Sequence, residues 1–167
     1  PQVLIQFAKR KDTHFKLFAG ITAYDSKSTL AMLGVEPELV KSNDTKIIDL
    51  LCKKAIMPST YLELLKKPNL TQANYAVILD ELKSIKKAER SKIGRELLNI
   101  SKFTNISTNM DGLLMLFVDK DDVMVEEILL HSDTQENVLD NYISTHINKN
   151  PKLIIAALKN PNVGLAS

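Results

Sequence analysis

This chain of 167 residues has little of what most specialised folds depend on. It has one cysteine and so forms no disulfide within itself, and such sparse cysteine is typical of a reducing compartment. It has no tryptophan, and aromatic residues make up 5% of the chain, which leaves little material for aromatic cages or base-stacking surfaces. Five glycines and six prolines are few for a turn-rich all-β fold. We therefore expect an all-α protein of an intracellular compartment, cytoplasmic or nuclear.

Signals for membranes and for secretion are missing as well. No run approaches the roughly 20 apolar residues of a membrane span, and no basic stretch precedes the apolar residues at the start of the chain. We expect no membrane partner. Because the first residue is Pro1 rather than methionine, we expect a processed chain or a fragment of a longer array, in which residues 1–167 are a single helical domain.

Charge is nearly balanced in total but uneven along the chain. The sum of 22 basic and 20 acidic residues is only +2. Residues 1–105 hold 18 basic and 11 acidic side chains, whereas residues 106–167 hold 4 and 9. This asymmetry predicts a molecule that is basic at one end and acidic at the other, which can orient a partner or favour head-to-tail self-association.

Apolar periodicity predicts a series of short helices from Thr13 onward, while the first eight residues fit either a strand or a helical turn. Polar residues that accept hydrogen bonds, and prolines, mark the expected helix starts. In chain order, these expected segments are a helix from Thr13, one near 28–33, a turn at Pro37, and helices at 45–52, 58–65, 71–85, 93–100, 109–118, 121–130 and 134–147 and from 150.

A short phrase recurs before these helices, in which asparagine and an aliphatic residue stand beside serine or threonine. It reads Asn69-Leu70-Thr71, Asn105-Ile106-Ser107 and Asn160-Pro161-Asn162-Val163, with Ser132-Asp133-Thr134-Gln135 as an echo. The steps from Asn105 to Asp133 and from Asp133 to Asn162 are almost equal in length. A short helix pair cannot bury both its apolar faces alone, so such repeats stack.

On these residues the chain resembles the leucine-rich-variant repeats and, more loosely, HEAT-like repeats. The resemblance is clearest over residues 59–167, above all in the units 105–131 and 132–160. It implies a right-handed α-solenoid of short helix pairs that presents a binding surface. It carries no catalytic residue, because the repeat motif is structural. The alternative is an irregular helical bundle in which Pro-Asn merely marks helix starts.

Sites for catalysis or for metals are not apparent in the sequence. The three histidines lie far apart, so we expect no metal site and no cofactor. Cys52 lies among apolar residues and is expected to be a buried thiol rather than a nucleophile. Asp119, Asp121 and Asp122 only partly resemble a calcium loop, because Val123 and Met124 follow. We expect Asp121 or Asp122 to cap a helix instead, and we expect no enzyme activity.

One cluster of basic residues is distinctive. Lys86, Lys87 and Arg90 lie three, four and seven residues after Lys83, so these four share one face if their segment is helical. Lys92 and Arg95 extend the patch. Such a patch attracts phosphates or an acidic protein, although basic residues are also common on solvated helix faces. A smaller basic cluster at Lys9–Lys11 is expected to be solvated. The predicted site consists of Lys83, Lys86, Lys87, Arg90, Lys92 and Arg95.

The sequence therefore predicts a non-enzymatic binding or scaffold module for a protein partner. The alternative is a nucleic-acid-binding protein that uses the basic segment 83–95. A base-excision enzyme on a HEAT-like scaffold is disfavoured, because so few aromatic residues are present to stack a base.

Overall fold

The fold is taken from a computed structural model, which describes residues 36–55 and 57–164. The predictions made for the first 35 residues, including the basic cluster at Lys9–Lys11 and the helix from Thr13, lie outside the described residues.

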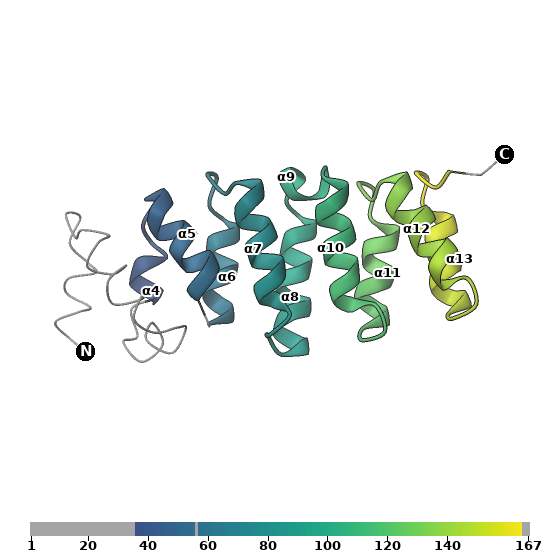
Figure 1. Cartoon of the computed structure of the whole chain (residues 1–167), viewed down its shortest axis with the longest axis horizontal. Helices are drawn as coiled ribbons and strands as arrows, with labels where there is room; N and C mark the ends of the chain where they lie inside the picture. The colour runs from purple at the N-terminus through teal and green to yellow at the C-terminus, as the bar shows by residue number, and fades with distance from the viewer. Residues whose placement is uncertain (1–35, 56, 165–167) are drawn as a thin grey trace. The chain divides into compact units, whose positions relative to one another are not determined.

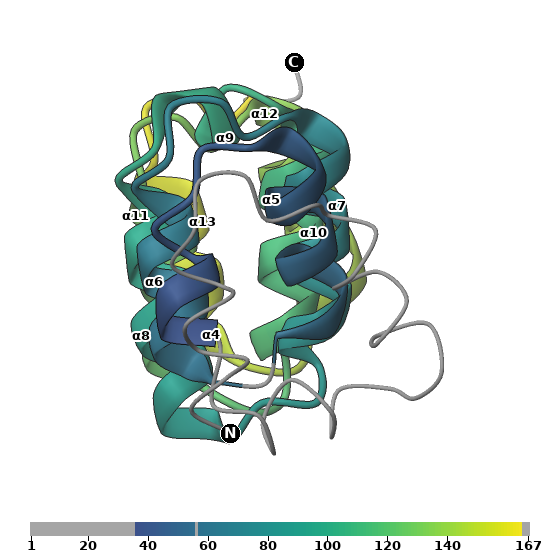
Figure 2. The same cartoon turned by 90° about the vertical axis from the view of Figure 1, so that its left-hand side faces the viewer.

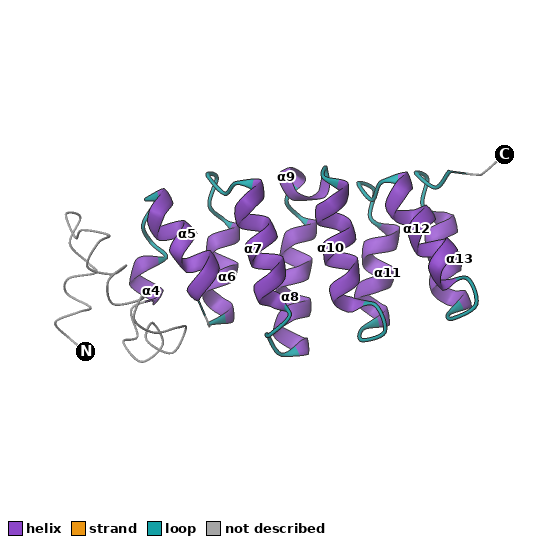
Figure 3. Cartoon of the chain, viewed as in Figure 1, coloured by secondary structure: helices purple, strands orange, loops and turns teal. Residues whose placement is uncertain are grey.

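Every regular element in the described part of the chain is an α-helix, as predicted (Figures 1 and 3). None of these helices has the length and apolarity needed to cross a membrane. The helices are α4 (Glu36–Leu39), α5 (Thr45–Lys54), α6 (Pro58–Leu65), α7 (Gln72–Leu82), α8 (Lys87–Leu98), α9 (Ser101–Thr104), α10 (Ser107–Phe117), α11 (Asp122–Leu130), α12 (Glu136–His146) and α13 (Pro151–Lys159).

Local capping chemistry sets where several helices begin. Asp44 accepts a hydrogen bond from the Lys46 amide at 2.8 Å at the start of α5, the helix that the sequence predicted from residue 45. Thr71 and Asn74 bond each other's backbone amides at the start of α7, which forms a reciprocal cap. Pro58 opens α6, where its missing N–H costs nothing. Caps and prolines act on the residues directly beside them, so these helix starts can be predicted from local sequence.

The chain divides into two compact units, residues 1–89 and 90–167. In the described part of the first unit, α5 packs beside α7 in one layer and against α6 in the other (Figure 2). Leu51, Leu64, Ile78 and Leu82 are fully buried there. At roughly 25 cal/mol per Å² of apolar surface removed from water, each such leucine contributes about 2 kcal/mol.

The second unit has the same two-layer construction. Helix α10 packs beside α12, α11 packs beside α13, and each pair is closed by α10–α11 and α12–α13 contacts (Figure 2). Its fully buried side chains include Leu97, Leu113, Ile128 and Leu139. Four short helices thereby share one apolar interior that no single pair could form.

The two helix pairs of the second unit share one repeat length. Helices α10 and α12 each have 11 residues, and helices α11 and α13 each have 9 residues. Glu136 lies as far beyond Ser107 in the sequence as Pro151 lies beyond Asp122. This common step defines one repeat, and residues one repeat apart are equivalent positions of the two pairs.

The same step separates Thr104, the last residue of α9, from Asp133, a loop residue, and the two side chains bond each other. The sequence phrase was aligned on Asn105 instead, so its first step to Asp133 is one position short of the true repeat. Its second step, from Asp133 to Asn162, agrees with the repeat of the helices. The structure therefore corrects the alignment of the repeat by a single position.

Side chains in the loops or at the adjoining helix ends tie successive pairs together. Thr104 Oγ1 donates to Asp133 Oδ2 at 2.6 Å. Asn160 Nδ2 donates to the carbonyls of Leu129 and His131 at 2.7 and 2.8 Å, and in the first unit Asn69 Nδ2 donates to the Asn43 carbonyl at 3.2 Å. The recurring asparagine phrase thus reflects loops that bond their neighbours, although Asn105 itself is exposed.

The condition under which the basic residues would share one helix face is not met. Helix α7 ends at Leu82 and α8 begins at Lys87, so residues 83–86 form a turn. The hydroxyl of Ser84 donates to the Glu81 carbonyl at 2.8 Å and satisfies one of the acceptors that the helix end exposes. The gap expected between helices at 71–85 and 93–100 therefore lies partly inside α8, and α9 was not predicted.

Candidate binding site

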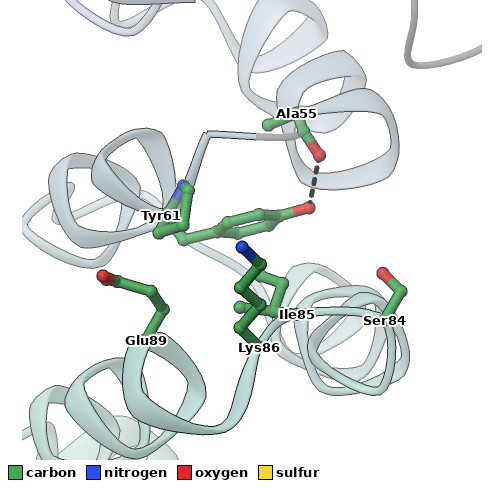
Figure 4. A pocket seen from close by; sticks show the side chains of 7 residues that line it. Ala55, Tyr61, Ser84, Ile85, Lys86 and Glu89 are labelled. Atoms are coloured by element: carbon green, nitrogen blue, oxygen red, sulfur yellow. Dashed lines mark hydrogen bonds between the residues drawn. The ribbon is translucent and has the colours of Figure 1, made fainter.

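The first unit contains an open pocket of about 530 Å³ beside the α7–α8 turn (Figure 4). Apolar surface from Ala55, Pro58 and Ile85 lines part of it. Residues from α5, α6 and the turn meet here because the chain folds back after α7. The full lining consists of Ala55, Pro58, Tyr61, Ser84, Ile85, Lys86 and Glu89.

Tyr61 holds one wall of this pocket in place. Its side chain is 1% exposed, and its hydroxyl donates to the Ala55 carbonyl at 2.7 Å (Figure 4). Burial, followed by the nearby carboxylates of Glu81 and Glu36, raises the pKa of the phenol far above its ordinary value. Tyr61 therefore stays a hydrogen-bond donor at physiological pH and is a rigid wall rather than an acid or a base.

Two side chains of opposite charge stand at the pocket. Lys86 comes from the turn and Glu89 from the first turn of α8, and both are exposed (Figure 4). Ser84 also lines the pocket, but its hydroxyl is bound to a backbone carbonyl as described above. The pocket thus offers an apolar floor with one cation and one anion, which suits a polypeptide segment that carries an apolar side chain between polar groups.

The predicted basic residues of the first unit differ in their surroundings. Lys83 pairs with Asp80 at 2.7 Å, and both side chains are exposed. Lys86 lines the pocket, and Lys87 begins α8. An exposed pair of this kind contributes at most about 1 kcal/mol to stability, but it reduces the local charge that Lys83 would offer to a phosphate.

In the second unit, Arg95 is committed to a carboxylate. Its Nε and Nη2 atoms donate to both oxygens of Glu127 at 2.8 to 3.1 Å. These hydrogen bonds raise the pKa of the Arg95 guanidinium. Arg90 is half-buried and Lys92 is exposed on the same helix. The fork of two nitrogens on one carboxylate is the geometry that arginine also uses for phosphate, so Glu127 occupies the group that nucleic acid would need.

The other sequence candidates have structural roles. Cys52 is fully buried, as predicted, and burial followed by the charge of Asp49 raises the pKa of its thiol to about 12. Asp121 caps α11 by accepting from the Met124 amide at 3.4 Å, as predicted, and it also accepts from Ser91 Oγ at 2.9 Å. Within residues 36–55 and 57–164, no group of three or more metal-ligating side chains is close enough to hold an ion.

Sequence reasoning missed most of the pocket and one buried carboxylate. In the sequence, Tyr61 and Ile85 look like ordinary members of apolar stripes. Only the turn at residues 83–86 places Ile85 beside Tyr61 of α6 at one pocket. Glu36 is fully buried and accepts from Thr60 Oγ1 at 2.7 Å and from the Met57 amide at 3.2 Å. A glutamate before proline carries no signal for this contact, which joins residues far apart in the sequence.

Comparison of the chain with models of known protein families, with curated proteins and with solved structures finds no match.

Proposed function

We propose that this protein is a non-enzymatic binding module that presents the surfaces of stacked helix pairs to a protein partner. In this proposal the pairs continue as a right-handed α-solenoid of the HEAT-like kind. The observation that carries the proposal is the pocket of the first unit. It is open and apolar-floored, it has one cation and one anion at its sides, and its tyrosine and serine hydroxyls are both bound to backbone carbonyls.

The partner segment that fits this pocket is an extended peptide with an aliphatic side chain. The aliphatic group would cover Ile85 beside the buried ring of Tyr61. Flanking acidic and basic residues of the peptide would meet Lys86 and Glu89. Burial of one aliphatic side chain is worth about 2 kcal/mol, so further contacts around the pocket would be needed for a stable complex.

A random dodecapeptide display library tests the proposal directly. We expect selection on the wild-type chain to enrich peptides with an aliphatic residue flanked by an acid and a base. Ile85→Asp should abolish their binding, because a buried carboxylate would replace apolar floor. Lys66→Glu is the control, since Lys66 is exposed directly after α6 and outside the pocket. Selected peptides that bind the Ile85→Asp variant as tightly as wild type would contradict the pocket.

Nucleic-acid binding is the second candidate, and the exposed Lys86, Lys87 and Lys92 favour it. A titration with duplex DNA and with RNA at two salt concentrations tests it, because phosphate contacts weaken steeply as salt rises. Absence of binding at low salt would remove this candidate. If binding occurs, a triple charge reversal of Lys86, Lys87 and Arg90 should abolish it, and unchanged binding would exclude these residues.

A further inference from the structure

Glu36 is a buried carboxylate whose presence packing alone does not explain. It lies in α4 and is 0% exposed, where a leucine would fill the interior without the cost of removing a charge from water. Its Oε2 atom accepts from the Thr60 hydroxyl at 2.7 Å and from the Met57 amide at 3.2 Å. Both donors belong to the start of α6, so the carboxylate joins two helices that are separate in the sequence.

Helix α6 has no side-chain cap from its own first residues. It begins after Met57, whose side chain makes no capping hydrogen bond, and Pro58 is its first residue. At the start of α7, by contrast, the Thr71 amide donates to the side chain of Asn74 within the same helix. Glu36 accepts from the Met57 amide as Asn74 accepts from the Thr71 amide, but it does so from another helix.

The residues that bind Glu36 stand directly beside the pocket of the first unit. Pro58 follows Met57 in the sequence and lines the pocket. Tyr61 follows Thr60 and lines it as well. Thr60 is 2% exposed, so its bond to Glu36 lies in an interior where hydrogen bonds are stronger than in water. The first turn of α6 therefore carries both the contacts of Glu36 and one wall of the pocket.

We propose that Glu36 is a positioning residue for this pocket. Its carboxylate holds the first turn of α6, and with it the wall made by Pro58 and Tyr61, in the geometry that receives a peptide. This inference rests on the proposed function of the pocket. It deepens that function, because it makes the affinity of the pocket depend on α4, a helix that does not line it.

Removal of the carboxylate should be felt at the pocket. In a Glu36→Leu variant the Met57 amide and the Thr60 hydroxyl lose their acceptor, and the first turn of α6 must shift to find another. We expect peptides selected on the wild-type chain to bind this variant about tenfold more weakly. Glu36→Gln should restore most of the affinity, because one amide oxygen can accept from both donors as Oε2 does.

Asp44→Ala is the matched control. It removes the cap of α5 in the same unit, and Asp44 does not line the pocket. Chemical denaturation measures how much stability each variant loses, and binding is measured at a temperature where both are folded. We expect Asp44→Ala to bind the selected peptides as tightly as wild type does. If Glu36 had only a structural role, Glu36→Leu would change binding no more than this control.

A second measurement needs no peptide. Ile85 lines the pocket beside Tyr61 (Figure 4), so the NMR signals of its methyl groups respond to the position of the aromatic ring. We expect Glu36→Leu to shift these signals and Asp44→Ala to leave them in place. If Glu36→Leu does not fold, Thr60→Val takes its place in both measurements, because it removes only one of the two bonds.

The outcomes separate this inference from the proposed function. Equal peptide affinity of wild type and Glu36→Leu, or equal weakening by Asp44→Ala, overturns the role of Glu36 and leaves the pocket in place. If no selected peptide binds the pocket, the proposed function fails, and the Ile85 signals alone decide whether Glu36 holds the wall. Signals that Glu36→Leu leaves unchanged would then overturn this inference as well.

Discussion

Cys52 is a buried side chain whose ionisation makes the stability of the first unit depend on pH. It lies on α5, fully buried, and the apolar residues around it in the sequence predicted that burial. What they do not indicate is the neighbouring Asp49, whose charge adds to burial in raising the pKa of the thiol to about 12. A thiol held protonated in this way is a packing group and a poor nucleophile.

We predict that this thiol makes the protein less stable in alkali. The unfolded thiol ionises from about pH 9, whereas the folded one stays protonated up to about pH 12. The unfolded state therefore binds fewer protons in this window, and the free energy of unfolding falls as pH rises, by up to about 1.4 kcal/mol per pH unit. Urea unfolding at pH 8, 9 and 10 should show this slope.

A Cys52→Ala variant supplies the control for that measurement. Its slope between pH 9 and 10 should be clearly smaller than that of wild type, although Tyr61, whose pKa burial also raises, adds a slope of its own above pH 10. A thiol reagent should label the wild-type protein only after unfolding. Rapid labelling of the native protein at pH 8 would show that Cys52 is accessible.

Gly94 is the second residue whose role depends on its surroundings. Within α8 it weakens the helix by roughly 1 kcal/mol relative to alanine, and the sequence offers no compensation. In the structure, a Cβ at this position would lie 3.0 Å from Met124 Cε and 3.1 Å from two ring atoms of Phe117. The glycine therefore allows α8 to approach α10 and α11 closely.

We predict that Gly94→Val lowers the free energy of unfolding by about 1–3 kcal/mol, because the branched side chain overpacks a well-filled contact. Chemical denaturation measures the change. Ala88→Val is the matched control, since Ala88 is exposed on the same helix and carries only the propensity cost of valine, about 0.5 kcal/mol. Equal losses in the two variants would mean that the Phe117 contact carries no energy.

At the scale of elements, the helix ends were predictable where a cap or a proline marks them. Asp44, Thr71 and Asp121 cap helices whose starts were predicted to within one residue, and Pro58 and Pro151 open theirs. The turn at residues 83–86 was not predictable, because Lys, Ser and Ile are all tolerated in helices. Its position depends on Leu82 being fully buried in the core while Lys83 and Ser84 face water.

The loop bonds are the element-scale feature with the clearest energetic consequence. Asn160 is 2% exposed, and its amide donates to two carbonyls while its oxygen accepts from the Asn162 amide at 2.9 Å. We predict that Asn160→Asp lowers the free energy of unfolding at pH 7 by about 1–3 kcal/mol, because a carboxylate cannot donate to those carbonyls.

The pH dependence of that variant gives a second test. Burial beside two carbonyls would raise the pKa of the new carboxyl in the folded protein above its value in the unfolded protein. The free energy of unfolding of the variant is therefore highest below the unfolded pKa and falls as pH rises above it. Part of the loss should therefore be recovered near pH 4 relative to pH 7. Asn105→Asp, at an exposed loop position, should change stability by no more than about 0.5 kcal/mol.

At the scale of the whole molecule, the sequence predicts one helical domain over residues 1–167, and this stays a prediction. By its internal contacts the chain divides into two compact units, at a boundary within α8. Each unit has its own fully buried leucines. In stacked repeats, stability is approximately a sum of unit and neighbour terms, so the units need not unfold as one.

We predict that damage to one core is felt mainly in its own unit. Leu64→Ala in α6 and Leu113→Ala in α10 each remove a fully buried side chain and should each cost about 2–5 kcal/mol. Native-state hydrogen exchange should show the larger loss of protection in α5–α7 for the first variant and in α10–α13 for the second. An equal loss in all described helices would support a single cooperative domain.

The sequence by itself determined the helical class, most helix starts and the recurring loop phrase, because capping and apolar periodicity act within a few residues. Only the tertiary structure decided which of those residues meet. It placed a turn at residues 83–86 within the basic segment, paired Arg95 with Glu127, formed the pocket beside Tyr61 and set the repeat register of α10 to α13. Most of these features join positions far apart in the sequence, and such contacts depend on how helix pairs stack rather than on local sequence preference.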